Sequence, residues 1–187
     1  PGMRGAFDAA VRRLSDLGAS VEPFALPVPL ANLSKHMSAL MAVEAYAHHR
    51  AFVDDPKSAL HGTIRARMAL GARIMAADWL TMCRERTQEI QRFGSALDRF
   101  DALLLPTTPF TAHAVEGVDE ALSPGAHTRF VNYLELCALS VPMSVTPDGL
   151  PTGLQIVCRR FDDPLALRIG HAFERARGPF PKPPMAV

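Results

Sequence analysis

The stretch DALLLPTTPF, residues 101–110, is where this sequence first places polar side chains in a pattern that could serve chemistry. An apolar run ends at two hydroxyls, Thr107 and Thr108, and the prolines at 106 and 109 stop the strand from continuing. A plain turn after a strand is the commoner origin of such a pattern. The alternative is a strand end that presents both hydroxyls to a polar group in a pocket, and the residues alone leave both interpretations open.

Two other places in the sequence could bind a ligand, the pair Glu44 and His48 and the single residue Arg67. Glu44 and His48 are four residues apart and share a helix face, but a metal ion needs further ligands that do not converge there. We therefore expect an ordinary side-chain pair, and neither a metal nor a cofactor. Arg67 could reach a cleft and hold a carboxylate through two parallel hydrogen bonds, or it could be a surface arginine. Arg65 and Arg73 are expected to face solvent.

Serine-dependent hydrolysis needs a serine beside a base, and no such arrangement is visible. The sequence has no G-x-S-x-G turn, and none of its serines lies in a glycine-rich segment. The three lysines, Lys35, Lys57 and Lys182, have no serine at a spacing that would pair with them. No catalytic residue is therefore predicted within this chain.

The composition indicates a globular chain. Its 187 residues, 48% of them hydrophobic, are enough for one ordinary domain, and the formal net charge is only +1. No apolar run is long enough to span a membrane, and the scattered, balanced arginines indicate no direct contact with nucleic acid. The cysteines at 83, 137 and 158 lack metal-binding spacing, so we expect reduced thiols and a cytoplasmic protein.

The elements that would position these residues follow from hydrophobic periodicity. Helices are expected over 3–17, 33–52, 63–100 (with an interruption near Asp78), 127–136 and 162–177, the last with Asp163 as its N-cap. Strands are expected over 20–27, 103–106, 139–145 and 152–159. Four methionines at helical spacing are expected in the core: Met37, Met41, Met68 and Met75. This order predicts an α/β fold built around a mixed sheet.

Several segments in order carry a resemblance to a known family. After DALLLPTTPF come T-x-x-x-N at Thr128 and Asn132, then LCALSVP, DGLPTGLQIV and FDDPLALRIGHAFE, and upstream IRARMALGARIMAADW contains R-x-x-x-G. This succession resembles the C-terminal half of the amidase signature family over residues 1–178, leaving a proline-rich tail at 179–187. The resemblance implies the C-terminal part of a mixed sheet sandwiched by helices, and hydrolysis of a carboxamide to a carboxylate plus ammonia or an amine.

In that family a lysine, a bridging serine and a nucleophilic serine form the catalytic triad, N-terminal to everything matched here. The resemblance therefore implies that this chain supplies sheet core and pocket wall but not the triad. It implies that Arg67, Thr107 and Thr108 bind substrate, since the arginine of R-x-x-x-G contacts the substrate carboxylate in tRNA-dependent amidotransferase A subunits. The expected partners are a small-molecule amide and either the N-terminal half of the enzyme or a second copy of the chain.

Two alternatives accompany this interpretation, namely an amidotransferase A subunit-like protein and a non-catalytic module that binds a partner. The chain also departs from the family pattern at ELCA, where Glu135 and Cys137 stand in place of the usual glycine and proline. A half-buried Glu135 would need a partner for its charge. These departures favour a divergent amidase.

Overall fold

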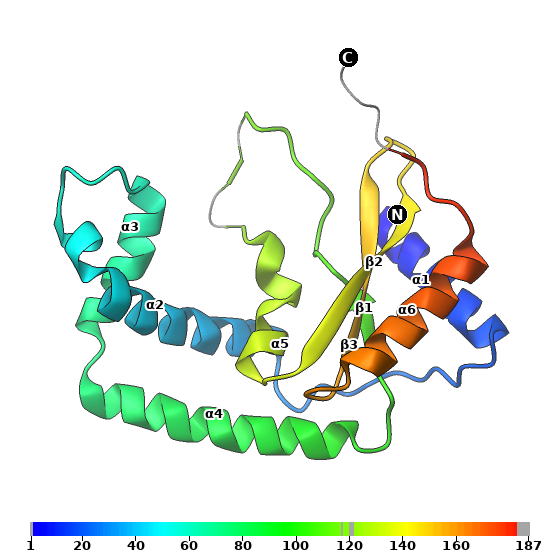
Figure 1. Cartoon of the computed structure of the whole chain (residues 1–187), viewed down its shortest axis with the longest axis horizontal. Helices are drawn as coiled ribbons and strands as arrows, with labels where there is room; N and C mark the ends of the chain where they lie inside the picture. The colour runs from blue at the N-terminus through cyan, green and yellow to red at the C-terminus, as the bar shows by residue number, and fades with distance from the viewer. Residues whose placement is uncertain (1, 117, 120–121, 183–187) are drawn as a thin grey trace. The chain divides into compact units, whose positions relative to one another are not determined.

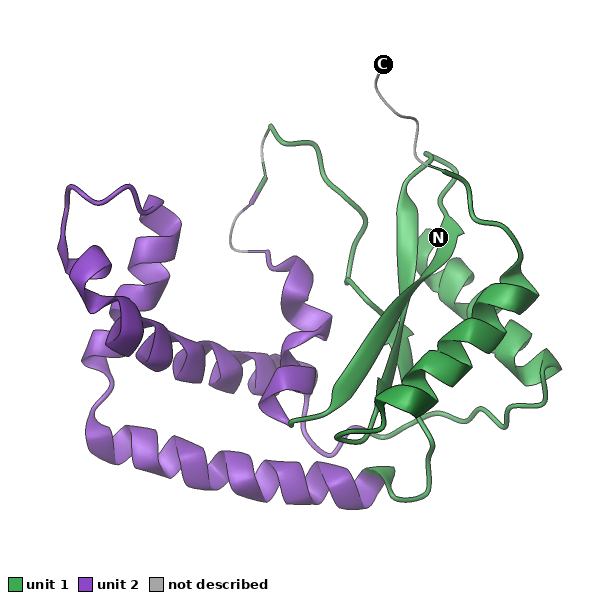
Figure 2. Cartoon of the chain, viewed as in Figure 1, with its two compact units in different colours: residues 1–25, 97–118, 135–187 green, residues 26–96, 119–134 purple. Residues whose placement is uncertain are grey.

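The computed structural model describes residues 2–116, 118–119 and 122–182, and these fall into two compact units (Figures 1 and 2). Unit 1 comprises residues 1–25, 97–118 and 135–187, and unit 2 comprises residues 26–96 and 119–134. Unit 1 contains the sheet. Unit 2 is helical.

The sheet of unit 1 has the strand order β1-β3-β2, and both pairings are antiparallel. The strands are β1 (Leu103–Pro106), β2 (Cys137–Val145) and β3 (Pro151–Cys158). A tight turn joins β2 to β3, in which the Gly149 amide donates to the Thr146 carbonyl over 2.9 Å. The predicted α/β class is confirmed, and the strands that this chain holds form an antiparallel portion of sheet.

Two helices pack on one face of this sheet. Helix α6 (Asp163–Arg177) contacts β2 and β3, and α1 (Gly2–Asp16) contacts α6 and the strands (Figure 1). Alternate residues of β3 face these helices because successive side chains of a strand point to opposite sides. The buried cluster between helices and sheet consists of Ala10, Leu14, Val141, Met143, Leu154, Ile156, Cys158, Ala166 and Phe173.

Unit 2 is organised around α2 (Leu30–Asp54), which contacts α3 (Gly62–Ala69), the 3₁₀ turn η1 (Leu70–Arg73) and α5 (Arg129–Tyr133). Two further elements complete it, α4 (Ala76–Leu97) and the 3₁₀ turn η2 (Pro124–His127). Phe93 and Phe130 meet in its core with ring centroids 6.0 Å apart. None of the helices in the described residues is long and apolar enough to cross a bilayer.

Most predicted elements are present, but one predicted strand is absent and one predicted helix is interrupted at a different place. Residues 19–26 form no strand: Pro23 and Pro27 cannot donate hydrogen bonds to a neighbouring strand, and alternation alone does not supply one. The long helix predicted over 63–100 breaks at 70–75 rather than near Asp78. The break is a 3₁₀ turn, which side-chain periodicity does not reveal.

Two smaller expectations were also wrong. Met41 and Met75 are 49% and 69% exposed, so these two methionines are not core residues. The N-cap of α6 is Asp162 rather than Asp163, although Pro164 does lie in the first turn. Of the predicted proline-rich tail, residues 179–182 form neither helix nor strand, and residues 183–187 lie outside the described part.

Gly71, the glycine of R-x-x-x-G, allows η1 to approach α2 closely. A Cβ atom built at this position would lie 2.1 Å from the carbonyl oxygen of Ala42 and 2.8 Å from the Cα of Val43. Both neighbours are backbone atoms of α2, which cannot rotate away as a side-chain tip could. Only glycine fits there without moving the helix.

We expect Gly71→Ala to lower the free energy of unfolding by about 3 kcal/mol or more, because the new methyl group overlaps helix backbone. Gly94→Ala is the matched control: Gly94 lies in α4 of the same unit, and a Cβ placed there would have nothing within 4 Å. It should raise stability by about 0.5–1 kcal/mol through helix propensity. Urea unfolding followed by circular dichroism measures both, and equal effects would refute the close-approach argument.

Candidate functional site

The two threonines that directly follow β1 have different hydrogen-bond partners. The Thr108 hydroxyl donates to the carbonyl of Phe110, two residues further on, over 2.8 Å. This local bond is typical of a threonine that stabilises a turn. The Thr107 hydroxyl instead reaches across the sheet to Ser140 on β2, with the two oxygens 2.7 Å apart. The turn interpretation thus holds for Thr108, whereas Thr107 makes a contact across the sheet that the sequence did not predict.

The Thr107–Ser140 pair depends on the absence of a side chain between them. β3 lies between β1 and β2, and at this level of the sheet β3 contributes Gly153, whose carbonyl accepts a 2.9 Å hydrogen bond from the Thr107 amide. A Cβ at Gly153 would lie 2.7 Å from the Thr107 hydroxyl oxygen and 3.0 Å from that of Ser140. Gly153, the second glycine of the DGLPTGLQIV segment, thus leaves the space in which the hydroxyls meet.

The hydroxyl pair lies on the sheet face opposite α1 and α6. On β3 the residues Leu154 and Ile156 belong to the core beneath those helices, so Gly153 and Gln155 point to the other side. Ser140 stands opposite Gln155 in the β2–β3 register and is exposed, whereas Gln155 is buried. This face of the sheet therefore carries polar side chains at the end where Thr107 lies.

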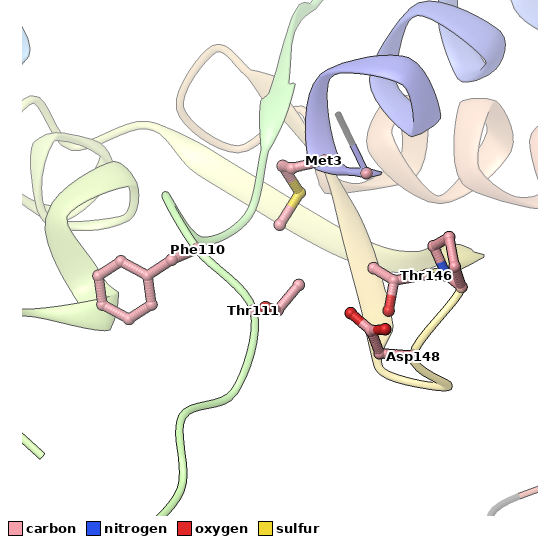
Figure 3. Close-up of a pocket in the computed structure, with 7 residues that line it drawn as sticks. Met3, Phe110, Thr111, Thr146 and Asp148 are labelled. Carbon is pink, nitrogen blue, oxygen red and sulfur yellow. The ribbon is translucent and has the colours of Figure 1, made fainter. Parts of the chain in front are cut away.

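Unit 1 also contains a shallow pocket. It is lined by Gly2 and Met3 of α1, by Phe110 and Thr111 beyond β1, and by residues 146–148 of the β2–β3 turn. Figure 3 shows the polar side chains of Thr146 and Asp148 on the turn, with Thr111 on the neighbouring segment. The pocket is mixed in character, with Met3 and Phe110 as its apolar wall, and Thr107 and Thr108 are not among the described residues that line it.

Arg67 lies on α3 in unit 2 and is exposed, whereas Thr107 and Thr108 lie in unit 1. Its neighbour Arg65, which was expected to face solvent, instead organises the loop between α2 and α3. Its guanidinium donates to the carbonyls of Phe52, Val53, Asp55 and Ser58 and to the Ser58 hydroxyl, over 2.5–3.1 Å. Such a set of acceptors suits the planar fork of arginine. The prediction for Arg65 was wrong because the loop folds back over the helix.

Glu135, which replaces the glycine usual in the family pattern, has a left-handed backbone with φ of 56°. Glycine adopts this conformation freely, and other residues adopt it at a cost of about 1 kcal/mol. The Glu135 carboxylate forms an ion pair with the Arg160 guanidinium, with the nitrogen and oxygen 2.8 Å apart. This ion pair supplies the charge partner that a half-buried Glu135 was expected to need. The departure from the pattern therefore lies at a strained turn that leads into β2.

A buried polar network in unit 2 escaped sequence reasoning. The hydroxyl of Tyr133 donates to the Glu89 carboxylate, and Nδ1 of His36 lies 3.4 Å from the same carboxylate. Arg86 donates to the carbonyls of Tyr133 and Asn132 at the end of α5. Burial, and then the bond to Glu89, raise the pKa of Tyr133 well above its usual value. In the sequence, the one hint of this network is a tyrosine, Tyr133, directly after the T-x-x-x-N segment.

Within the described residues, neither a serine–lysine hydrogen bond nor a cluster of potential metal ligands is present. No serine hydroxyl among them is hydrogen-bonded to a lysine: those of Ser34, Ser38 and Ser58 bond to backbone carbonyls, and that of Ser140 bonds to Thr107. Nowhere in residues 2–116, 118–119 and 122–182 do three or more potential ligands, Glu44 and His48 included, gather around one point.

The cysteines are free thiols. Cys158 is buried, and its burial raises the thiol pKa to about 12, so it stays protonated at neutral pH. Burial also raises the pKa of Cys137, whose thiol donates to the Arg159 carbonyl. Raised pKa values of this kind describe packing residues rather than nucleophiles.

The family model described as Amidase matches residues 1–167, and the chain therefore belongs to the amidase family. The allophanate hydrolase of Kluyveromyces lactis superposes on 92% of the chain with a TM-score of 0.84 and 27% identity. An amidase of known structure covers 93% of it with a TM-score of 0.80 and 25% identity.

Curated relatives include the A subunits of glutamyl-tRNA(Gln) amidotransferase from several bacteria. The protein from Exiguobacterium sp. is 28% identical over 98% of the chain, and the one from Acidothermus cellulolyticus is 32% identical over 94%. The chain spans only 43% and 41% of the lengths of these two relatives.

The packing at Gly153 can be tested by substitution. We expect Gly153→Ala to lower the free energy of unfolding by about 1–3 kcal/mol, because its Cβ would force apart the hydroxyls of Thr107 and Ser140. Gly5→Ala in α1 of the same unit, where nothing lies within 4 Å of the new methyl group, should be stabilising by up to about 1 kcal/mol. Chemical denaturation compares them, and an unchanged midpoint for Gly153→Ala would contradict the geometry.

The role of Arg65 gives a separate prediction. Arg65→Lys should lower the stability of unit 2 by about 2 kcal/mol, since an ammonium group cannot serve this set of acceptors at once. Hydrogen exchange should rise in residues 53–58 before it rises elsewhere. Arg73→Lys, at an exposed position of η1, is the control and should change neither quantity. If the two variants behaved alike, the loop would not depend on Arg65.

Proposed function

We propose that this chain is the C-terminal part of an amidase that cleaves a carboxamide to a carboxylate and ammonia or an amine. The observation that carries the proposal is the family match over residues 1–167. The similarity to allophanate hydrolase and to an amidase at 25–27% identity supports the same chemistry. Within this enzyme, residues 1–178 belong to the amidase domain and residues 179–187 form a tail.

The nucleophile and the base of this reaction are supplied by residues outside the chain. Support comes from Ser34, Ser38 and Ser58, whose hydroxyls donate to backbone carbonyls, and from Ser140, whose hydroxyl bonds to Thr107. The contribution of the chain is then to bind and orient the substrate. Correct placement of a reacting group can supply several kcal/mol of the reduction in the activation barrier, so a pocket wall is not a passive part of such an enzyme.

Arg67, Thr107 and Thr108 are the proposed substrate-binding residues. The guanidinium of Arg67 suits a carboxylate, which it can bind through two parallel hydrogen bonds. Thr107 presents a hydroxyl on the sheet face opposite α1 and α6, whereas the Thr108 hydroxyl is already engaged with Phe110. We therefore assign Thr107 the direct contact, and assign Thr108 the task of fixing the turn that holds it.

The proposed partners are a small-molecule amide and the N-terminal half of the enzyme, or a second copy of the chain, with no direct contact to nucleic acid. A sheet with two edge strands, β1 and β2, favours such an association because unpaired strand edges tend to bind further strands. The free thiols at 83, 137 and 158 favour a cytoplasmic location.

A second candidate is an amidotransferase A subunit. Its support is that glutamyl-tRNA(Gln) amidotransferase A subunits recur among the curated relatives, at 28–32% identity over 94–98% of the chain. The departure at Glu135 favours the free-standing amidase. Co-purification with other subunits separates the two, since only the amidotransferase needs them.

The proposal predicts that the isolated chain is silent and that the complete product of its gene is active. Ammonia release would be measured from a panel of aliphatic, aromatic and amino-acid amides, with a serine-reactive fluorophosphonate probe in parallel. Neither turnover nor labelling is expected from residues 1–187. Both are expected from the complete gene product, and Arg67→Ala should raise its KM for carboxylate-bearing amides about tenfold or more.

Two results would overturn the proposal. Turnover or labelling of residues 1–187 would mean that one of its serines is activated by a base within the chain. Silence of the complete gene product toward every amide would instead favour the non-catalytic module that binds a partner. Arg73→Ala, at an exposed arginine near Arg67 in sequence, is the control and should leave KM unchanged.

A further inference from the structure

We propose that Ser140 and Thr107 together form a two-hydroxyl subsite that binds an uncharged polar group of the substrate, such as a second carboxamide. The inference rests on the proposed function and narrows it by naming a substrate class. Ser140 is the new residue: it belongs to β2, lies 33 positions from Thr107 in the sequence, and matches none of the binding positions that the family resemblance implies.

The geometry fixes the pair firmly. The two hydroxyl oxygens are 2.7 Å apart, which is the usual length of a hydrogen bond between hydroxyls. Thr107 is anchored through its amide to the Gly153 carbonyl, and Ser140 is anchored within a strand that pairs with β3 along its length. Because Gly153 has no side chain, the space above β3 stays open where the two hydroxyls meet.

The hydrogen-bonding capacity that remains determines what the pair can bind. Each hydroxyl has one proton to donate and two lone pairs that accept. One proton is used between the two oxygens, so the pair still offers one donor and several acceptor sites side by side. A group that both accepts and donates hydrogen bonds at adjacent atoms satisfies both, and a carboxamide, with its carbonyl oxygen next to its NH₂, is such a group.

The surroundings favour a neutral ligand. Gly153 and Gln155, which share this end of the sheet face, carry no charge, so an ionic group would gain no counter-ion from them. Ser140 is exposed in unit 1, so the subsite is accessible from this side of the sheet. Thr108 offers no equivalent site because its proton already goes to Phe110.

The test uses the complete gene product and two series of substrates, straight-chain monoamides and the α,ω-diamides of the same length. Ser140→Ala should raise KM for the best diamide about tenfold with kcat within about twofold, and should leave the monoamides unchanged. Thr107→Val should raise KM for the same diamide by a similar factor. The double variant should be no worse than either single one, because removing one hydroxyl already breaks the pair.

Two controls accompany these variants. Ser144→Ala makes the same change on the same strand, where the hydroxyl bonds only to the carbonyl of Val145, and it should leave every KM unchanged. Ser140→Thr keeps the hydroxyl and should restore wild-type KM for the diamide. Melting temperatures of all variants establish that each one is folded.

The outcomes separate this inference from the function on which it rests. An active enzyme in which Ser140→Ala leaves the diamide KM unchanged, or raises KM for both series equally, overturns the subsite and leaves the amidase proposal standing. An enzyme that hydrolyses no amide overturns the proposed function and the subsite with it. A diamide-specific rise in KM that Ser140→Thr reverses supports both.

Discussion

The central position of β3 is the constraint on which unit 1 depends. Pairing with β1 on one side and β2 on the other fixes which residues of β3 face α1 and α6. Leu154, Ile156 and Cys158 fill the core on that face, and each is at most 1% exposed. A shift of register by one residue would turn this set toward the opposite face and bury Gln155 among the helices instead. Burial of these apolar side chains in the core therefore also determines the sheet face on which Gly153 lies.

The same register decides the chemistry of the opposite face. Because Leu154 must point into the core, Gly153 must point away from it, at the level where β1 ends and Thr107 follows. Ser140 comes from β2 and Thr107 directly follows β1, and their hydroxyls meet because the middle strand contributes no side chain between them. A polar site and an apolar core are thus built from alternate residues of one strand, which a sheet with two different faces permits.

In unit 2, several helices are too short to be stable alone and depend on tertiary contacts. Helix α5 has five residues, far fewer than an isolated helix needs. Its stability comes from tertiary contacts: Arg86 binds the carbonyls of its last two residues, and Tyr133 is buried with its hydroxyl on Glu89. The turn that follows carries Glu135 in its left-handed conformation and leads into β2, the strand that bears Ser140. The departure from the family pattern therefore lies close in sequence to the proposed subsite.

The sequence by itself determined the class of fold, the three strands and the main helices, because hydrophobic periodicity and proline positions are local properties of the chain. It also determined the family, since the order of several weak motifs is specific where each one alone is not. Tertiary structure alone decided which threonine bonds across the sheet, that Ser140 is its partner, and that Arg65 binds a loop rather than solvent. These facts depend on contacts between residues distant in sequence, whose geometry follows from strand register and loop path and leaves no periodic trace in the chain.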